Sequence, residues 1–110
     1  MREAITAVVA RGDIWSGIAA SEPYDVAWAG EAVIFLRSLG ATGNPQEARA
    51  WVQISPDGLR WVDEGSMLAI PDVDGISSVR IRNFGTYLRI RTVLPEGASF
   101  KALVTISLKE

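Results

Sequence analysis

Arginine recurs at every second position in two short stretches of the chain. Arg80 and Arg82 form the first pair and Arg89 and Arg91 the second, each alternating with aliphatic residues. This spacing places both arginines of a pair on one face of a β-strand, and we expect the two rows to lie on neighbouring strands. Their guanidinium groups could hold a phosphate, a sulfated sugar or an acidic protein surface. We favour pairing with some of the 13 acidic residues, or plain solvation.

Trp51 is the one tryptophan of four that alternation places on an outward face, between Arg49 and Gln53. A flat indole beside hydrogen-bonding side chains could stack on a sugar ring. Tryptophan and arginine are also enriched as anchors of subunit interfaces, which is the reading that we favour. With Tyr87, which precedes the second arginine row, the predicted interface or ligand face comprises Arg49, Trp51, Gln53, Arg80, Arg82, Tyr87, Arg89 and Arg91.

Cysteine and histidine are both absent, which removes thiolate nucleophiles, imidazole catalysis and the common zinc, copper and haem ligands. The acidic residues that could hold a cation are Asp63, Glu64, Asp72 and Asp74, but their spacing matches no EF-hand loop. We expect a solvated acidic loop, no metal and no cofactor. A carboxylate pair for glycoside hydrolysis needs a deep cleft that so small a domain rarely builds, so we expect no enzymatic activity.

The charge balance argues against partners that carry many negative charges. The chain has 11 basic and 13 acidic residues, a net charge of -2, so neither nucleic acid nor an anionic membrane is an expected partner. Its hydrophobic content of 48% is high for a small domain and favours self-association.

Neither a signal peptide nor a membrane span is expected near the start of the sequence. Met1, Arg2 and Glu3 place an acid where a basic leader should continue, and the apolar residues 4–10 are too few to span a bilayer. We expect a chain that is cytoplasmic when made, with incorporation into a virion left open.

Period-two alternation and turn dipeptides along the whole chain predict an all-β fold. Residues 48–54 alternate clearly, and Ser55, Pro56, Asp57 and Gly58 then predict a hairpin turn into a strand over 59–63. Further strands are predicted over residues 4–10, 13–19, 32–38, 79–82, 87–91 and 100–109. Residues 32–38 are apolar on both faces, which is typical of a central strand or one covered by another subunit. We predict one domain over residues 1–110, an antiparallel β-sandwich of jelly-roll type with seven or eight strands.

The stretch from Val52 to Trp61, with Ser-Pro-Asp-Gly-Leu-Arg-Trp at its end, and the later Thr-Tyr-Leu-Arg-Ile resemble motifs of discoidin (F5/8 type C) jelly rolls. Similar hairpins occur in small accessory β-sandwiches of phage particles and bacterial surfaces. The chain is shorter than a discoidin domain and lacks its bracketing cysteines, and no ligand-binding residue can be carried over. We expect Asp57 to cap its own turn and Trp61 to close one end of the core.

Two functions from different classes follow from these features. The first is a non-enzymatic structural protein, a decoration or tail-associated component of a phage-like particle, that forms homo-oligomers with a trimer as one form. The alternative is a carbohydrate-binding module with a discoidin-like jelly roll, which would bind glycan through aromatic residues such as Trp15, Trp28 or Trp51.

Overall fold

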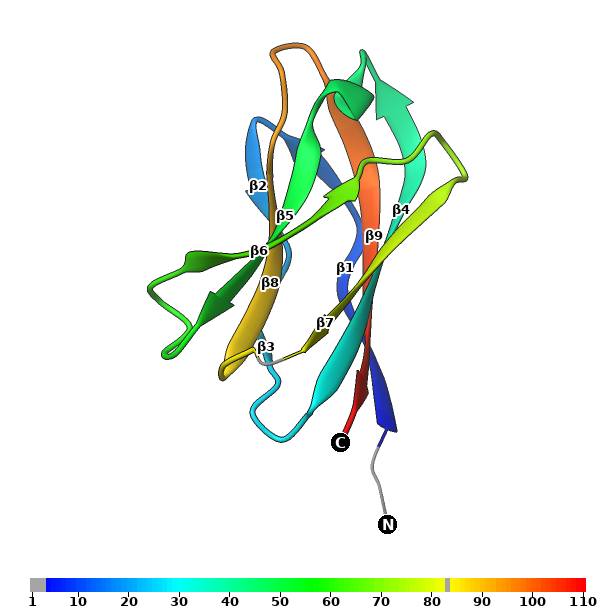
Figure 1. The fold of residues 1–110 in the computed structure, drawn as a ribbon. Helices are drawn as coiled ribbons and strands as arrows, with labels where there is room; N and C mark the ends of the chain where they lie inside the picture. Colours follow the sequence, from blue (N-terminus) through cyan, green and yellow to red (C-terminus); the bar gives the residue numbers. More distant parts are fainter. Residues whose placement is uncertain (1–3, 83) are drawn as a thin grey trace.

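The computed structural model describes residues 4–82 and 84–110, in which nine β-strands and a short 3-10 helix, η1, are found (Figure 1). The strands are β1 (Ala4–Ser16), β2 (Ile18–Ala20), β3 (Tyr24–Asp25), β4 (Glu31–Thr42), β5 (Arg49–Ser55), β6 (Val62–Ala69), β7 (Ile76–Arg82), β8 (Tyr87–Val93) and β9 (Ser99–Lys109), and η1 is Pro45–Glu47. The predicted all-β fold is confirmed. The prediction that used Met1, Arg2 and Glu3 concerns positions outside the described residues. Within the described part, no helix is long and apolar enough to cross a membrane.

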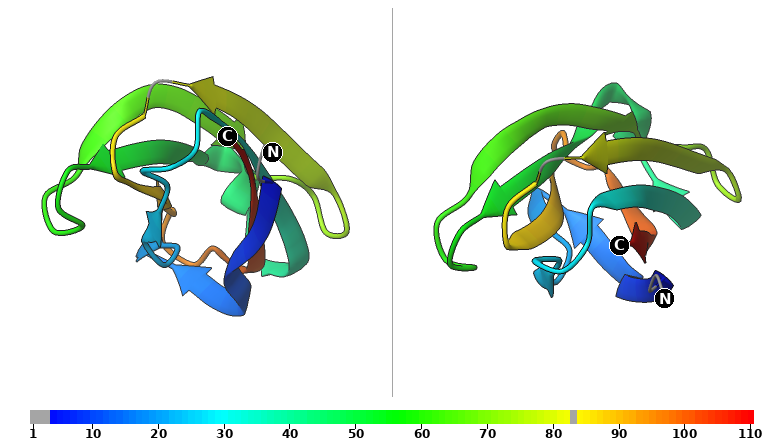
Figure 2. Two further views of the ribbon diagram at one scale, coloured as in Figure 1. Left: turned by 90° about the horizontal axis from the view of Figure 1, so that it is seen from below. Right: turned by 60° about the horizontal axis from the view of Figure 1, so that its bottom comes forward.

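The strands form two antiparallel sheets with the orders β1-β9-β4-β7 and β2-β8-β5-β6, and β3 also pairs with β8. β1 pairs with β9, β2 and β3 with β8, β4 with β7, and β5 with β6. If β2 and β3 are taken as one interrupted strand, the first strand pairs with the last, the second with the next to last, and so on inward. Such a nested set of pairs folded over two facing sheets is a jelly roll, which confirms the predicted sandwich (Figure 2).

The predicted separate strands over residues 4–10 and 13–19 are wrong, because most of this segment is the single strand β1. It pairs with β9 along its whole length, with register shifts between Val8 and Ala10 and between Arg11 and Asp13. Gly12, at the second shift, has a φ of 86°, a conformation that other residues rarely adopt. Such bulges let a strand continue where its alternation breaks, and a broken pattern in the sequence resembles the end of a strand.

β4 is the strand that the sequence marks as apolar on both faces, and it lies between β9 and β7. Ile34 and Leu36 on its inner face are fully buried, whereas Val33 and Phe35 on its outer face are half-buried under neighbouring side chains. The double apolar pattern therefore reflects a central position in a sheet.

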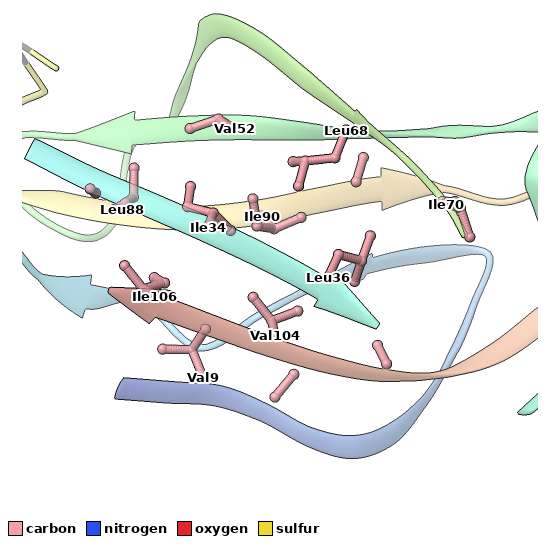
Figure 3. Packing of buried hydrophobic residues seen from close by; sticks show 14 of the residues in the cluster. Val9, Ile34, Leu36, Val52, Leu68, Ile70, Leu88, Ile90, Val104 and Ile106 are labelled. Carbon is pink, nitrogen blue, oxygen red and sulfur yellow. The ribbon is translucent and has the colours of Figure 1, made fainter. Parts of the chain in front are cut away.

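The core lies between the two sheets and is built from the side chains of each strand that point toward the opposite sheet (Figure 3). Ile34 and Leu36 face Val52 and Ile90 of the other sheet, and all four side chains are fully buried. At the end of the core near the β8–β9 loop, the ring of Trp15 meets Phe100 edge-to-face with centroids 5.7 Å apart. Trp15 is 3% exposed, so the expectation that it could bind a glycan is wrong.

Candidate interaction surface

The turn between β5 and β6 is held by side-chain hydrogen bonds. Ser55 Oγ accepts from the backbone N–H of Asp57 (3.2 Å) and of Gly58 (2.8 Å). Asp57 Oδ1 accepts from the N–H groups of Leu59 and Arg60, each at 2.9 Å, which confirms that Asp57 caps its own turn. Because these two amides bond to Asp57, they do not pair with β5, and β6 begins at Val62, later than the predicted start at residue 59.

The same contacts act on the acidity of Asp57. The N–H groups of Arg60 and Leu59 stabilise the carboxylate and lower the pKa of Asp57 below its ordinary value of 3.8. Because the pKa of Asp57 is lower in the folded state than in the unfolded state, its ionised carboxylate stabilises the fold. This stabilisation is fully present above the pKa of the unfolded state and is lost as the pH falls through the pKa of the folded state.

Titration of the Asp57 carboxyl by NMR is therefore expected to give a midpoint below 3.8. Urea unfolding of Asp57→Asn should lose less stability than the wild type as the pH drops below about 4, since the asparagine has no charge to neutralise. A midpoint at or above the ordinary value would show that the turn does not hold the carboxylate.

Trp61 follows this turn and lies on the outer face of the second sheet. The guanidinium carbon of Arg89 lies 4.3 Å from the centroid of its ring, within the range of a cation–π contact. Trp61 is half-buried and is absent from the core, so the expectation that it closes one end of the core is wrong. Its place is decided by Arg89, a residue distant in the sequence.

Arg89 is fixed from two sides. Its Nε donates to Gln53 Oε1 at 2.9 Å, and Gln53 Nε2 donates in turn to Asp63 Oδ1 at 3.0 Å. Burial of the guanidinium, followed by repulsion from Arg91, lowers the pKa of Arg89. An arginine remains charged at neutral pH in such a setting, so the contact with Trp61 keeps its cationic character.

Trp51 lies in the next row of the same face. Across the strands it is opposite Arg91 of β8 and Met67 of β6, and Arg91 is opposite Ala20 of β2. Trp51 and Arg91 are half-buried, and Met67 is 47% exposed. An apolar row with one cation therefore crosses β2, β8, β5 and β6.

These two rows, with Arg49 above them, form one surface that we name the arginine-tryptophan face. Its residues are Arg49, Trp51, Gln53, Trp61, Asp63, Met67, Arg89 and Arg91. The structure thus brings together five of the eight residues predicted as an interface or ligand face. Trp61, Asp63 and Met67 were not among those predicted. Their place depends on the long turn and on the register shift between Trp51 and Gln53, which alternation does not reveal.

Tyr87 lies on the same side of β8 as Arg89 and Arg91, in the row next to Arg89 and at the edge of the arginine-tryptophan face. It is opposite Ser55 in β5, and its ring passes 3.6 Å from where a Cβ at Gly58 would stand. Gly58 also has a φ of 78°, so this turn position suits glycine for two reasons. The Tyr87 ring therefore lies next to the turn at Gly58.

Arg80 and Arg82 lie elsewhere, and the expectation that the two arginine rows lie on neighbouring strands is wrong. They belong to β7 in the first sheet, whereas Arg89 and Arg91 belong to β8 in the second. Arg82 Nη2 lies 3.5 Å from Glu31 Oε2 of β4, a cross-strand ion pair of the predicted kind.

The acidic residues considered as cation ligands are not gathered into a site. Asp63 bonds to Gln53 at the start of β6, and Asp72 and Asp74 lie in the loop beyond its end. Among residues 4–82 and 84–110, no three acidic side chains come close enough together to hold a metal ion.

Comparison with known proteins identifies a fold and no family. No protein-family model matches the chain, and no curated protein matches its sequence. Among solved structures, the chain resembles the crystal structure of the SPBc2 prophage-derived protein YomS, with a TM-score of 0.62 and 6% sequence identity. The match covers 100% of this chain and 96% of YomS. The resemblance to discoidin domains finds no support in these comparisons, and the chain shares with YomS a fold that spans its whole length.

Proposed function

We propose that this protein is a non-enzymatic structural component of a phage-like particle that self-associates through the arginine-tryptophan face. The observation that carries the proposal is the gathering of two tryptophans, three arginines and a methionine on one sheet face. Tryptophan, arginine and methionine are among the residue types enriched at the centres of protein interfaces.

Half of the residues of the face are already held by contacts with one another. Arg89 is held between Gln53 and the Trp61 ring, and Gln53 is held by Asp63. Ordering a free side chain at an interface costs about 0.5–1.5 kcal/mol, and side chains that are already ordered avoid most of that cost. These fixed contacts favour binding of a partner over plain solvation of the arginines.

The charges of the face indicate how two copies would meet. The face carries three arginines, Arg49, Arg89 and Arg91, and one acid, Asp63, which give it a net charge of +2. Because the whole chain has a net charge of -2, the residues outside the face carry a net charge of -4. A two-fold dimer that sets the face against itself would bring like charges together. The face of one copy would instead meet an acidic surface of the next. Such a head-to-tail contact forms a ring when the rotation between copies closes, and a trimer is the smallest ring of this kind.

The phage context is supported by the whole-length likeness in fold to a prophage-derived protein. Eight-stranded jelly rolls recur in viral capsid proteins, where they serve as building blocks. A role without catalysis is supported by the composition, which lacks the histidine and cysteine used in much of general acid–base and nucleophilic catalysis.

Sedimentation velocity over a concentration series tests this proposal. We expect a discrete oligomer, with a trimer as the leading form, whose dissociation increases with added salt because the contacts pair opposite charges. A monomer at every concentration and at low salt would overturn self-association.

A carbohydrate-binding role is the second candidate, since Trp51 lies beside Gln53 on an outer face. The structure offers it less support, because Arg89 covers the Trp61 ring and Trp51 is half-buried. A change in tryptophan emission with one member of a glycan panel would favour it, whereas unchanged emission across the panel would exclude an aromatic platform.

A further inference from the structure

A second charged surface lies on the outer face of the first sheet, on the opposite side of the sandwich from the arginine-tryptophan face. There a hollow of about 310 Å³ is lined by Glu31, Ala32, Val33, Arg80, Ile81, Arg82, Ser107 and Lys109. These residues come from β4, β7 and β9, the three neighbouring strands of the sheet. The hollow has three cationic side chains and one acidic side chain in its lining.

The register places these side chains in two rows. Arg80, Val33 and Ser107 lie opposite one another in the first row, and Arg82, Glu31 and Lys109 in the second. The rows are two residues apart, or about 6.6 Å along the strands. Val33 forms the floor of the first row, with a guanidinium on one side of it and a hydroxyl on the other.

The three cationic side chains differ in whether they already form an ion pair within the protein. Arg82 pairs with Glu31, and a smaller hollow beside it is bordered by Glu110. Within the described part of the chain, the side chains of Arg80 and Lys109 make neither a hydrogen bond nor an ion pair with another residue. The side chains of Arg80 and Lys109 therefore border the same hollow without an ion pair of their own, with Ser107 beside them and Glu31 on the strand next to Lys109.

From this arrangement we propose that the hollow binds a single tetrahedral oxyanion group, a phosphate ion or a phosphate monoester, held by Arg80, Lys109 and Ser107. Arginine binds such oxygens through two parallel hydrogen bonds, lysine adds a point charge, and a serine hydroxyl donates one bond. Glu31 keeps Arg82 at the edge of the hollow and limits the excess positive charge, which suits one anionic group.

The surroundings of the hollow argue for a single group and against a polyanion. The next row of the same face holds Ser78, Phe35, Thr105 and Val8, none of which is charged. A polyphosphate backbone would need a continuous basic track, and this uncharged row separates the hollow from Arg37 and Arg11, the next cations on the face.

The test is an NMR titration of the full chain with sodium phosphate at constant ionic strength, with sodium chloride as the reference salt. We expect saturable shifts of the amides of Val33, Arg80, Ser107 and Lys109, with a dissociation constant on the order of 1 mM. Arg80→Gln and Lys109→Gln should each weaken binding by about tenfold or more, because each removes a charge-assisted contact.

Arg37→Gln is the matched control, since Arg37 is an exposed arginine of β4 on the same outer face but outside the hollow. It should leave the affinity within about twofold of the wild type. Amide spectra of each variant report its folding independently of binding. Equal shifts with chloride, shifts that do not saturate, or an Arg80→Gln affinity equal to that of the wild type would overturn the proposal.

Two further titrations distinguish the source of the group. A sugar phosphate should bind as well as inorganic phosphate, because both present one terminal tetrahedral group. A short DNA oligonucleotide should bind no more tightly than phosphate. Affinity that rises with oligonucleotide length would contradict a single-group site and would indicate a surface for nucleic acid.

Discussion

Arg91→Glu is expected to turn the oligomer into a monomer at concentrations where the wild type is fully associated. Arg91 is half-buried at the centre of the arginine-tryptophan face, between Trp51 and Ala20 on the neighbouring strands. Loss of one partner of a charge pair inside an interface costs about 2–5 kcal/mol, and reversal of the charge adds repulsion against the acidic partner surface. The association constant should therefore fall by at least about thirtyfold.

Sedimentation velocity at matched concentrations measures this effect, and Arg37→Glu is its control. Arg37 is an exposed arginine on the outer face of the other sheet, so the same charge change there alters the net charge without touching the arginine-tryptophan face. We expect Arg37→Glu to associate like the wild type. If both variants dissociate equally, net charge and not this face governs assembly.

Phe100→Ala is expected to destabilise the protein strongly. Phe100 is 1% exposed, and it meets the Trp15 ring edge-to-face at a centroid distance of 5.7 Å. Truncation of a buried phenylalanine costs about 3–5 kcal/mol through lost burial and the cavity left behind. Small domains are stable by only about 5–15 kcal/mol, so the variant should be close to unfolding at 37 °C.

Urea unfolding followed by tryptophan fluorescence measures the loss, and Ile76→Ala serves as the surface control. Ile76 is 60% exposed at the start of β7, so its truncation should change the free energy of unfolding by less than about 0.5 kcal/mol. A loss below about 1 kcal/mol for Phe100→Ala would show that this end of the core is loosely packed.

The sequence predicts the strands of this protein well where alternation is regular. In β9, the residues predicted on one face, from Phe100 to Leu108 at every second position, are all buried. The Ser55–Gly58 turn and the central position of residues 32–38 follow from equally local signals. Alternation within one strand is a property of the pleated backbone, so it needs no knowledge of neighbouring strands.

Relations between strands are harder to predict, as the two arginine rows show. Both rows alternate regularly and are close in the sequence, but β7 belongs to one sheet and β8 to the other. A short turn within a sheet and a crossing between facing sheets use the same residue types. The position of Trp61 is equally hard to predict from its neighbours in the sequence, because it depends on a contact with Arg89 of β8.

Side-chain oxidation by hydroxyl radicals, read out by mass spectrometry, tests most directly whether the arginine-tryptophan face is buried on self-association. Met67 and Trp51 are oxidisable side chains that lie opposite each other on this face, and Trp28, half-buried outside it, is an internal reference. We predict that oxidation of Met67 and Trp51 falls severalfold from the monomer to the oligomer while that of Trp28 is unchanged. Equal oxidation of Met67 in the two states would contradict the account.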